Sequence, residues 1–176
     1  MPLKKGCIQV YTGEGKGKTT ASVGLAVRAR GSDLRVIFVQ FVKGGSMSGE
    51  LAMLRKLGVE VVRTAEKNSG LMTTGGLTEE DYAAAAEAWK IAEDAISSGN
   101  YDLVICDEIN VAMHYNMIKT NDVIHTLTNR PESVEVVCTG RNVPELISDM
   151  ADLITEMKPH KHPYQQGIPA RRGIEF

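Results

Sequence analysis

Short apolar runs alternate with helix-length segments from one end of the chain to the other. The runs lie at residues 7–12, 34–42, 59–63, 101–108, 134–140 and 151–157, and each predicts a β-strand. The run at 34–42 is almost continuously apolar, which is typical of a strand covered on both faces. This repeated β–α alternation predicts an α/β fold, a mainly parallel sheet with helices on both faces.

Helices are predicted between these runs: one after the first run and ending at Gly31, then others at 50–57, 78–98, 120–129 and 143–150. The longest begins at TEED (78–81), which resembles a capping box, and ends at Gly99. Its apolar stripe, expected to face the core, consists of Tyr82, Ala86, Trp89, Ala92 and Ile96. Residues 64–77 have no consistent period and contain three glycines, so a loop is predicted there.

The end of the chain has a different character. Residues 158–176 are rich in proline, glycine and basic side chains and show no period, which predicts an irregular tail. No internal repeat or shift in composition divides the sequence. Residues 1–176 are therefore predicted to form a single domain.

Composition and charge exclude several classes of protein. Twenty basic and 22 acidic residues leave a net charge of −2, so no overall basic footprint indicates binding to nucleic acid or an anionic membrane. No apolar run approaches the roughly 20 residues of a membrane span, and the first residues lack the apolar core of a signal peptide. Cys7, Cys106 and Cys138 lie in apolar runs without metal-binding spacing and are expected to be buried. A cytoplasmic protein is predicted.

The sequence GEGKGKTT at 13–20 lies between the first predicted strand and the first predicted helix. It nearly matches the phosphate-binding pattern G-x-x-x-x-G-K-[ST], but its first glycine falls one residue late. Glycines at such a turn let backbone N–H groups face an anion, and the following helix adds its positive N-terminal end. Lys18 is then placed to contact phosphate oxygens, and Thr19 to reach a phosphate and Mg²⁺. The loop predicts polyphosphate binding.

A second motif is LVICDE at 103–108, an apolar strand that ends in two acids. This is the Walker B arrangement, in which an acid at the carboxyl edge of the sheet holds Mg²⁺ directly or through water. Asp107 and Glu108 are the candidates. Ligands of open α/β sheets bind at the carboxyl ends of the strands, so both motifs point to one crevice.

Basic residues and histidines outside these motifs leave alternatives open. Arg28, in the first helix, either contacts phosphate or lies in solvent, and Arg141 follows a strand end at the ligand-binding edge. His160 and His162 are flanked by prolines and have no cysteine nearby, which favours a surface turn over a metal site.

Four blocks of the sequence together resemble the ATP:corrinoid adenosyltransferases of the CobA/CobO/BtuR type, over nearly the whole chain. The blocks are YTGEGKGKTTA, DLVICDEIN, NRPESVEVVCTGRN and ADLITEMKPHKHPYQQGIPARRGIEF. The family's own loop has the form G-[NDE]-G-K-G-K-T-T, so the short spacing matches its pattern. The resemblance implies a P-loop NTPase (RecA-like) fold and synthesis of adenosylcobalamin.

The resemblance also implies how the substrates bind and react. ATP lies in the loop in the reverse sense to most P-loop enzymes, Co(I) of the corrinoid attacks C5′, and triphosphate departs. Catalytic roles fall to Lys18, Thr19 and Glu108, and Mg²⁺ or Mn²⁺ is held by Thr19 and Glu108 with Asp107. The implied ATP-binding residues are Gly13, Glu14, Gly15, Lys16, Gly17, Lys18, Thr19, Thr20, Arg28 and Arg141.

One segment departs from the family pattern. Well-studied relatives carry a Phe-x-Trp pair before the long helix, where it crowds the lower face of the corrinoid, whereas NSGLMTTGGL (68–77) has no aromatic residue. Leu71 and Met72 are expected to fill part of that space. The resemblance further implies a homodimer and a reducing flavoprotein as partner.

Two other functions remain open at this point. In a P-loop ATPase that couples hydrolysis to a partner, Glu108 is the base that orients water. In a nucleotide sensor, ATP binds without turnover. The released product distinguishes the three possibilities: triphosphate, orthophosphate or neither.

Overall fold

A six-stranded sheet with the order β3-β2-β4-β5-β1-β6 lies at the centre of the computed structural model, which describes residues 3–44, 49–65 and 76–175. Every neighbouring pair of strands is parallel, as predicted. The strands are β1 (Ile8–Thr12), β2 (Val36–Gln40), β3 (Glu60–Arg63), β4 (Leu103–Asp107), β5 (Glu135–Thr139) and β6 (Leu153–Glu156). The predicted loop at 64–77 falls largely outside the described residues.

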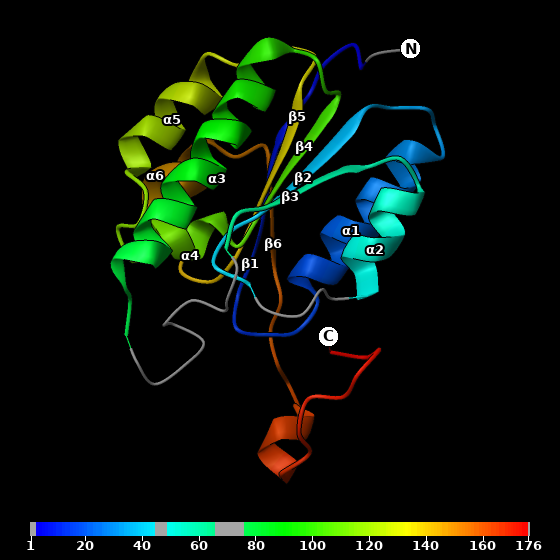
Figure 1. Ribbon diagram of the computed structural model, residues 1–176, viewed down its shortest axis with the longest axis vertical. Helices are drawn as coiled ribbons and strands as arrows, with labels where there is room; N and C mark the ends of the chain where they lie inside the picture. Colours follow the sequence, from blue (N-terminus) through cyan, green and yellow to red (C-terminus); the bar gives the residue numbers. More distant parts are fainter. Residues whose placement is uncertain (1–2, 45–48, 66–75, 176) are drawn as a thin grey trace.

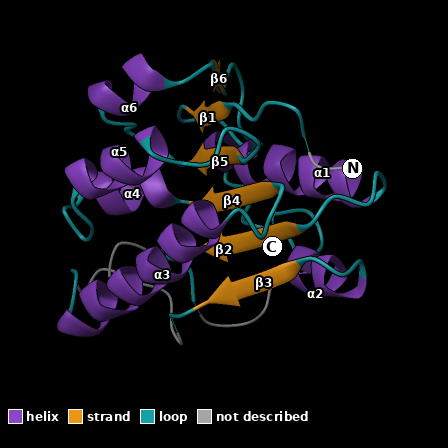
Figure 2. Cartoon of the chain, turned by 90° about the horizontal axis from the view of Figure 1, so that it is seen from above, coloured by secondary structure: helices purple, strands orange, loops and turns teal. Residues whose placement is uncertain are grey.

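Helices cover both faces of this sheet. On one face lie α1 (Lys18–Arg30) and α2 (Gly49–Lys56), and on the other α3 (Glu79–Ser98), α4 (Ile109–His114), α5 (Thr120–Thr128) and α6 (Glu145–Met150) (Figures 1 and 2). The predicted α/β architecture is therefore confirmed. The bounds of the short helix α4 were not predicted. No helix in the described part of the chain has the length and apolar character needed to cross a membrane.

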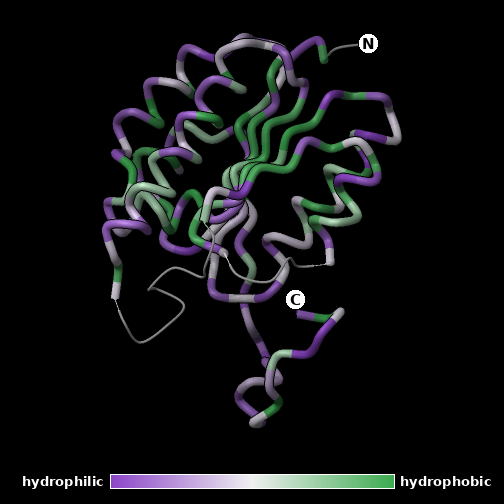
Figure 3. Tube along the Cα trace, in the orientation of Figure 1, coloured by the Kyte–Doolittle hydropathy of each residue, from purple (hydrophilic) through white to green (hydrophobic). Residues whose placement is uncertain are grey.

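The core follows from the continuous apolar runs. All residues of β2 and β4 are buried, which explains why neither run alternates between apolar and polar positions. Two apolar clusters result, one under α3 to α6 and a smaller one under α1 and α2. Figure 3 shows the apolar strands at the centre and hydrophilic segments where the strands end. The ends of the strands, not their middles, therefore carry the polar chemistry.

Helix α3 begins at the predicted capping box. The Thr78 side chain accepts a hydrogen bond from the Asp81 N–H at 3.3 Å, and the Asp81 carboxylate accepts one from the Thr78 N–H at 2.8 Å. Trp89 is buried, as predicted.

The predicted stripe of α3 is partly wrong. Tyr82 and Ala86 are exposed, whereas Ala85 and Ala88 are buried against the sheet. The run of alanines at 83–86 offers no contrast in hydropathy, so the pattern alone did not determine the orientation of the helix.

Two of the three cysteines are buried as predicted. Cys106 and Cys138 have no exposed surface, and burial raises the pKa of Cys138 to about 12, so these thiols stay protonated. Cys7 is only half-buried because it precedes β1 rather than lying within it.

The chain after β6 leaves the sheet and passes the glycine loop (Figure 1). It is irregular apart from the short 3₁₀ helix η2 (Pro163–Gln166), and its residues are mostly exposed. His162 begins this turn by accepting a hydrogen bond from the Tyr164 N–H at 3.2 Å. The prediction of a surface turn at His160 and His162 is consistent with this geometry.

We expect Thr78→Ala to lower the free energy of unfolding by about 1 kcal/mol, because it removes the N-cap of α3. Thr78→Ser keeps the hydroxyl and should retain most of that stability. Urea unfolding followed by circular dichroism measures both variants. Equal losses in the two would contradict a role for the cap.

Candidate active site

The glycine loop between β1 and α1 is held against the chain that follows β6. Gly13 and Gly17 have φ values of +95° and +127°, which side chains other than glycine rarely adopt. A Cβ atom would lie 2.5 Å from the Met157 carbonyl oxygen at Gly13 and 2.7 Å from it at Gly15. The Gly15 N–H donates to that same oxygen at 2.7 Å, so this N–H anchors the loop instead of facing the cavity.

Lys18 is the first residue of α1 and folds back over the loop. Its ammonium donates to the carbonyl oxygens of Gly13 at 2.6 Å and Gly15 at 2.9 Å, and the residue is only 8% exposed. Burial lowers the pKa of Lys18, and the nearby Glu108 carboxylate opposes that effect. Neutral carbonyl groups therefore hold a cation at the centre of the loop.

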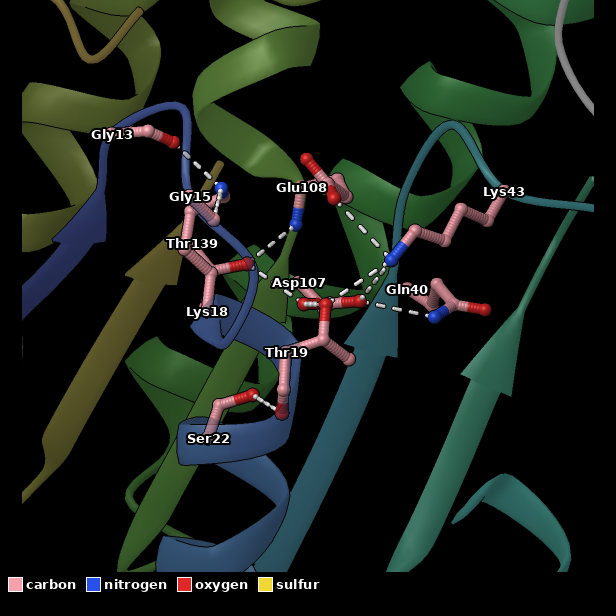
Figure 4. A network of polar contacts seen from close by, with 10 residues as sticks. All are labelled: Gly13, Gly15, Lys18, Thr19, Ser22, Gln40, Lys43, Asp107, Glu108 and Thr139. Atoms are coloured by element: carbon pink, nitrogen blue, oxygen red, sulfur yellow. Dashed lines mark hydrogen bonds and ion pairs between the residues drawn. The ribbon is translucent and has the colours of Figure 1, made fainter. Parts of the chain in front are cut away.

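The carboxylate of Asp107, at the end of β4, joins three other elements (Figure 4). It has no exposed surface, and its Oδ1 accepts hydrogen bonds from Thr19 at 2.9 Å and Thr139 at 2.7 Å. Its Oδ2 accepts from Gln40 Nε2 at 3.0 Å, because the parallel register places Gln40 beside Asp107. These bonds connect β4 with α1, β5 and β2.

Glu108 follows directly and leaves the strand through a left-handed turn with φ of +66°. Its N–H donates to Thr139 Oγ1 at 3.0 Å, which stabilises that turn. The turn separates the two acids: Asp107 stays buried in the hydrogen-bond network, whereas Glu108 lines the cavity.

A further basic residue, Lys43, completes the network and was not predicted. Its Nζ lies 3.1 Å from Thr19 Oγ1, 3.5 Å from Asp107 Oδ2 and 3.3 Å from Glu108 Oε1. Burial by itself lowers the pKa of Lys43, but the carboxylates of Asp107 and Glu108 outweigh burial and raise it. The residue follows Val42, a β-branched residue with φ of +64°. Such a conformation is strained and sets the direction of the next side chain.

The two arginines considered from the sequence have different positions. Arg141 lines the cavity, and its Nε lies 3.2 Å from Glu14 Oε2 in a largely exposed ion pair. Such an exposed pair contributes little to stability. Arg28 is exposed on α1 and is not among the residues that line the cavity. Its predicted contact with phosphate is not supported by this placement.

These residues surround one cavity of about 880 Å³, within the usual range for small-molecule sites. The loop residues from Glu14 to Thr20 line it, together with Val42, Lys43, Glu108, Val111, Tyr115, Arg141 and Asn142. His162, Gly173, Ile174 and Glu175 add a wall from the tail. Lys16 faces that wall. Its ammonium donates hydrogen bonds to the Ile174 carbonyl oxygen at 2.8 Å and to Glu175 Oε1 at 3.1 Å. The predicted loop and strand-end motifs therefore meet at one site.

Sequence reasoning missed three polar partners of this site. Gln40 and Thr139 are the last residues of buried parallel strands, as Asp107 is. The rule that selected Asp107 also applies to them. Lys43 has no such signal, because its position depends on the turn at Val42. Leu71 and Met72, the predicted corrinoid contacts, lie outside the described residues.

The oxygen atoms near Lys43 fit a hard divalent cation. Thr19 contributes a hydroxyl, and Asp107 and Glu108 contribute carboxylates, the donor types that Mg²⁺ prefers. Among the described residues no group of three or more His, Cys, Asp or Glu side chains is placed to hold a metal alone. This is expected where Mg²⁺ takes its remaining ligands from water and phosphate.

Known proteins of similar sequence are corrinoid adenosyltransferases. A corrinoid adenosyltransferase from Sinorhizobium sp is 37% identical over 98% of this chain and 81% of its own length. The corrinoid adenosyltransferase of Escherichia coli K12 is 36% identical over 98% of this chain and 87% of its own length.

A solved structure of the flagellar accessory protein FlaH from Methanocaldococcus jannaschii shares the fold. Its TM-score is 0.51 at 15% identity, over 88% of this chain and 72% of FlaH. Together with the loop between β1 and α1, this likeness confirms the predicted P-loop fold. The family model for ATP:corrinoid adenosyltransferase BtuR/CobO/CobP matches residues 4–176, so the chain belongs to that family.

Proposed function

We propose that this chain transfers the 5′-deoxyadenosyl group of ATP to the Co(I) ion of a corrinoid and releases triphosphate. The proposal rests on the convergence of Lys18, Thr19 and Glu108 on one cavity, in a chain of the ATP:corrinoid adenosyltransferase family. ATP and a corrinoid are the substrates that this family implies. The proposed product is an adenosylated corrinoid, for the synthesis or salvage of adenosylcobalamin.

In the proposed complex, ATP lies along residues 13–20 in the reverse sense to most P-loop enzymes. The γ-phosphate then takes the place that the α-phosphate ordinarily holds, and C5′ of the ribose faces the corrinoid. Glu14, which lines the cavity next to Arg141, lies near the ribose in this orientation. Bringing cobalt close to C5′ in a confined site lowers the barrier through orientation.

The reaction is a displacement at carbon. The electron pair of Co(I) forms the bond to C5′ while the bond from C5′ to the α-phosphate oxygen breaks. That bonding pair leaves with triphosphate, and cobalt is formally oxidised to Co(III). Because no proton is removed from the nucleophile, the step needs no general base.

Stabilising the leaving group is the main task of the protein in this mechanism. Triphosphate carries about four negative charges, and fixed cations and N–H groups stabilise such a group most effectively in a site that excludes water. Lys18, Lys16 and Arg141, which line the cavity, would do so, along with backbone N–H groups at the start of α1. Each of these side chains contacts a carbonyl or carboxylate oxygen that phosphate oxygens would replace.

Thr19, Asp107 and Glu108 would hold Mg²⁺ or Mn²⁺, directly or through water. When bound there, the ion supplies charge neutralisation of the phosphate oxygens. The position of the Lys43 ammonium supports this assignment, because it shows that the same oxygens already stabilise a positive charge.

Several further predictions accompany the proposal. They are a homodimer, a flavoprotein that reduces the corrinoid, a cytoplasmic location and a single domain spanning residues 1–176. Contacts of Leu71 and Met72 with the corrinoid are also proposed.

Product analysis separates this function from the two alternatives. With ATP, Mg²⁺ and chemically reduced cobalamin, we expect one triphosphate to be released for each corrinoid that is adenosylated. The corrinoid spectrum measures adenosylation, and ion chromatography measures triphosphate. Orthophosphate formed without corrinoid would instead indicate an ATPase with Glu108 as its base. Absence of turnover with retained ATP binding would indicate a sensor.

We expect Lys18→Ala to lower the rate of adenosyl transfer by about 10²- to 10³-fold, because a fixed cation is lost from the leaving-group site. Circular dichroism should show a folded protein. Lys90→Ala removes a lysine from the exposed face of α3 and serves as the control. Normal activity of Lys18→Ala would refute the phosphate assignment.

We expect Gly15→Ala to abolish ATP binding measured by calorimetry. The added Cβ would lie 2.7 Å from the Met157 carbonyl oxygen and push the loop off its anchor. Gly24→Ala is the matched control, because a Cβ there meets no atom within 4 Å. Because Gly24 lies in the interior of α1, Gly24→Ala should leave ATP binding unchanged and raise the free energy of unfolding by about 0.5–1 kcal/mol. If Gly15→Ala and Gly24→Ala bound ATP with the same affinity, the close contact between Gly15 and Met157 would have no role in ATP binding.

A further inference from the structure

The ammonium of Lys43 occupies the point where the candidate metal ligands converge. Its Nζ contacts Thr19 Oγ1 at 3.1 Å, Glu108 Oε1 at 3.3 Å and Asp107 Oδ2 at 3.5 Å. Figure 4 shows the side chain reaching across from the end of β2 to these oxygens. A lysine therefore holds the position that a divalent cation would need.

We propose that Lys43 is an internal cation that keeps the metal site closed until the nucleotide enters, and so couples metal binding to ATP binding. This inference rests on the proposed function for the identity of the nucleotide and the metal ligands. It adds a role for a residue that the transfer mechanism does not otherwise use.

The first step of the argument is that the ammonium and the metal exclude each other. Mg²⁺ binds oxygen ligands at about 2.0–2.1 Å, so an ion on these oxygens would lie close to the present position of Nζ. Two cations at such a distance repel strongly in a partly buried site. Free metal must therefore displace Lys43 from its two carboxylate partners before it binds.

The hydroxyl of Thr19 supplies the second step. It donates its hydrogen to Asp107 Oδ1 at 2.9 Å and accepts one from Lys43 at 3.1 Å. A hydroxyl has one hydrogen and two lone pairs. Lys43 therefore takes up one of the lone pairs with which Thr19 would bind a metal, and competes with the metal for a ligand as well as for space.

The nucleotide removes this competition. Lys43 lines the same cavity as the loop, its side chain is 30% exposed, and it has a flexible four-carbon stem. A triphosphate in the cavity offers new anionic partners, so the ammonium exchanges carboxylate oxygens for phosphate oxygens. The metal and the nucleotide then each favour binding of the other, because linkage is reciprocal.

A purely structural ion pair is the competing explanation. In that case Lys43 only neutralises the buried charge of Asp107, and its loss lowers stability without changing the relation between metal and ATP. The two explanations differ in metal affinity measured without any nucleotide, which is the basis of the experiment.

The experiment measures Mn²⁺ binding by electron paramagnetic resonance, with and without ATP and always without corrinoid. In the unmodified protein, ATP should increase the affinity for Mn²⁺ at least about tenfold, within the usual range of coupling between sites. Lys43→Met should bind Mn²⁺ without nucleotide at least about tenfold more tightly than the unmodified protein, and the effect of ATP should fall accordingly. Lys43→Gln tests the same point if the methionine variant does not fold.

Two variants control for charge. Lys43→Arg keeps the positive charge and should keep the Mn²⁺ affinity low. Lys90→Met removes a distant exposed charge from α3 and should match the unmodified protein. The proposal is overturned if neutral variants at position 43 bind Mn²⁺ no more tightly than the unmodified protein. It is also overturned if ATP leaves the Mn²⁺ affinity of the unmodified protein unchanged.

Failure of this inference is distinguishable from failure of the proposed function. The Mn²⁺ measurements involve no corrinoid, whereas the transfer reaction is judged by its triphosphate product. A protein that makes triphosphate without coupled metal binding would refute only the role of Lys43. Coupled binding without adenosyl transfer would refute only the transfer reaction.

Discussion

The buried carboxylate of Asp107 is the constraint on which the rest of the site depends. A charge with no exposed surface is tolerated only when its oxygens are hydrogen-bonded and a counter-charge is near. Thr19, Thr139 and Gln40 supply the hydrogen bonds, and Lys43 supplies the charge. These four partners come from different parts of the chain. Their contacts with the Asp107 carboxylate therefore fix the relative positions of the loop, three strand ends and the segment after β2.

The glycine loop is fixed from its other side by the end of the sheet. β6 is exposed along its whole length and pairs only with β1 among the described strands, yet the chain that follows it presents the Met157 carbonyl to Gly15. Gly13 and Gly15 carry no side chain at this contact because a Cβ would overlap Met157. The short spacing of the GEGKGKTT motif is therefore consistent with a loop that packs against the end of β6 and the residue after it. The other side of the loop is then left to Lys18.

How much the sequence predicts depends on whether a feature is local. Continuous apolar runs predicted the strands, and polar residues at their ends predicted Asp107 and Glu108. The bounds of helix α4 were not predicted because its six residues begin one residue after β4 and four of them are buried, so they show little amphipathic contrast. The alanine-rich α3 was oriented incorrectly for a similar reason. Lys43 depends on one left-handed residue and on partners 24 and 64 positions away, which no local pattern encodes.

The cations of the site share one property that bears on how it binds a polyanion. Lys16 contacts Glu175, Lys43 contacts Asp107 and Glu108, Arg141 contacts Glu14, and Lys18 contacts carbonyl oxygens. Pairing avoids the mutual repulsion of four positive groups around one cavity. When a polyphosphate enters, these cations exchange their present oxygen partners for phosphate oxygens. The free energy gained is then the difference between the phosphate contacts and the contacts that they replace. A singly charged anion replaces few of these contacts, so the arrangement favours ligands that carry several phosphates together.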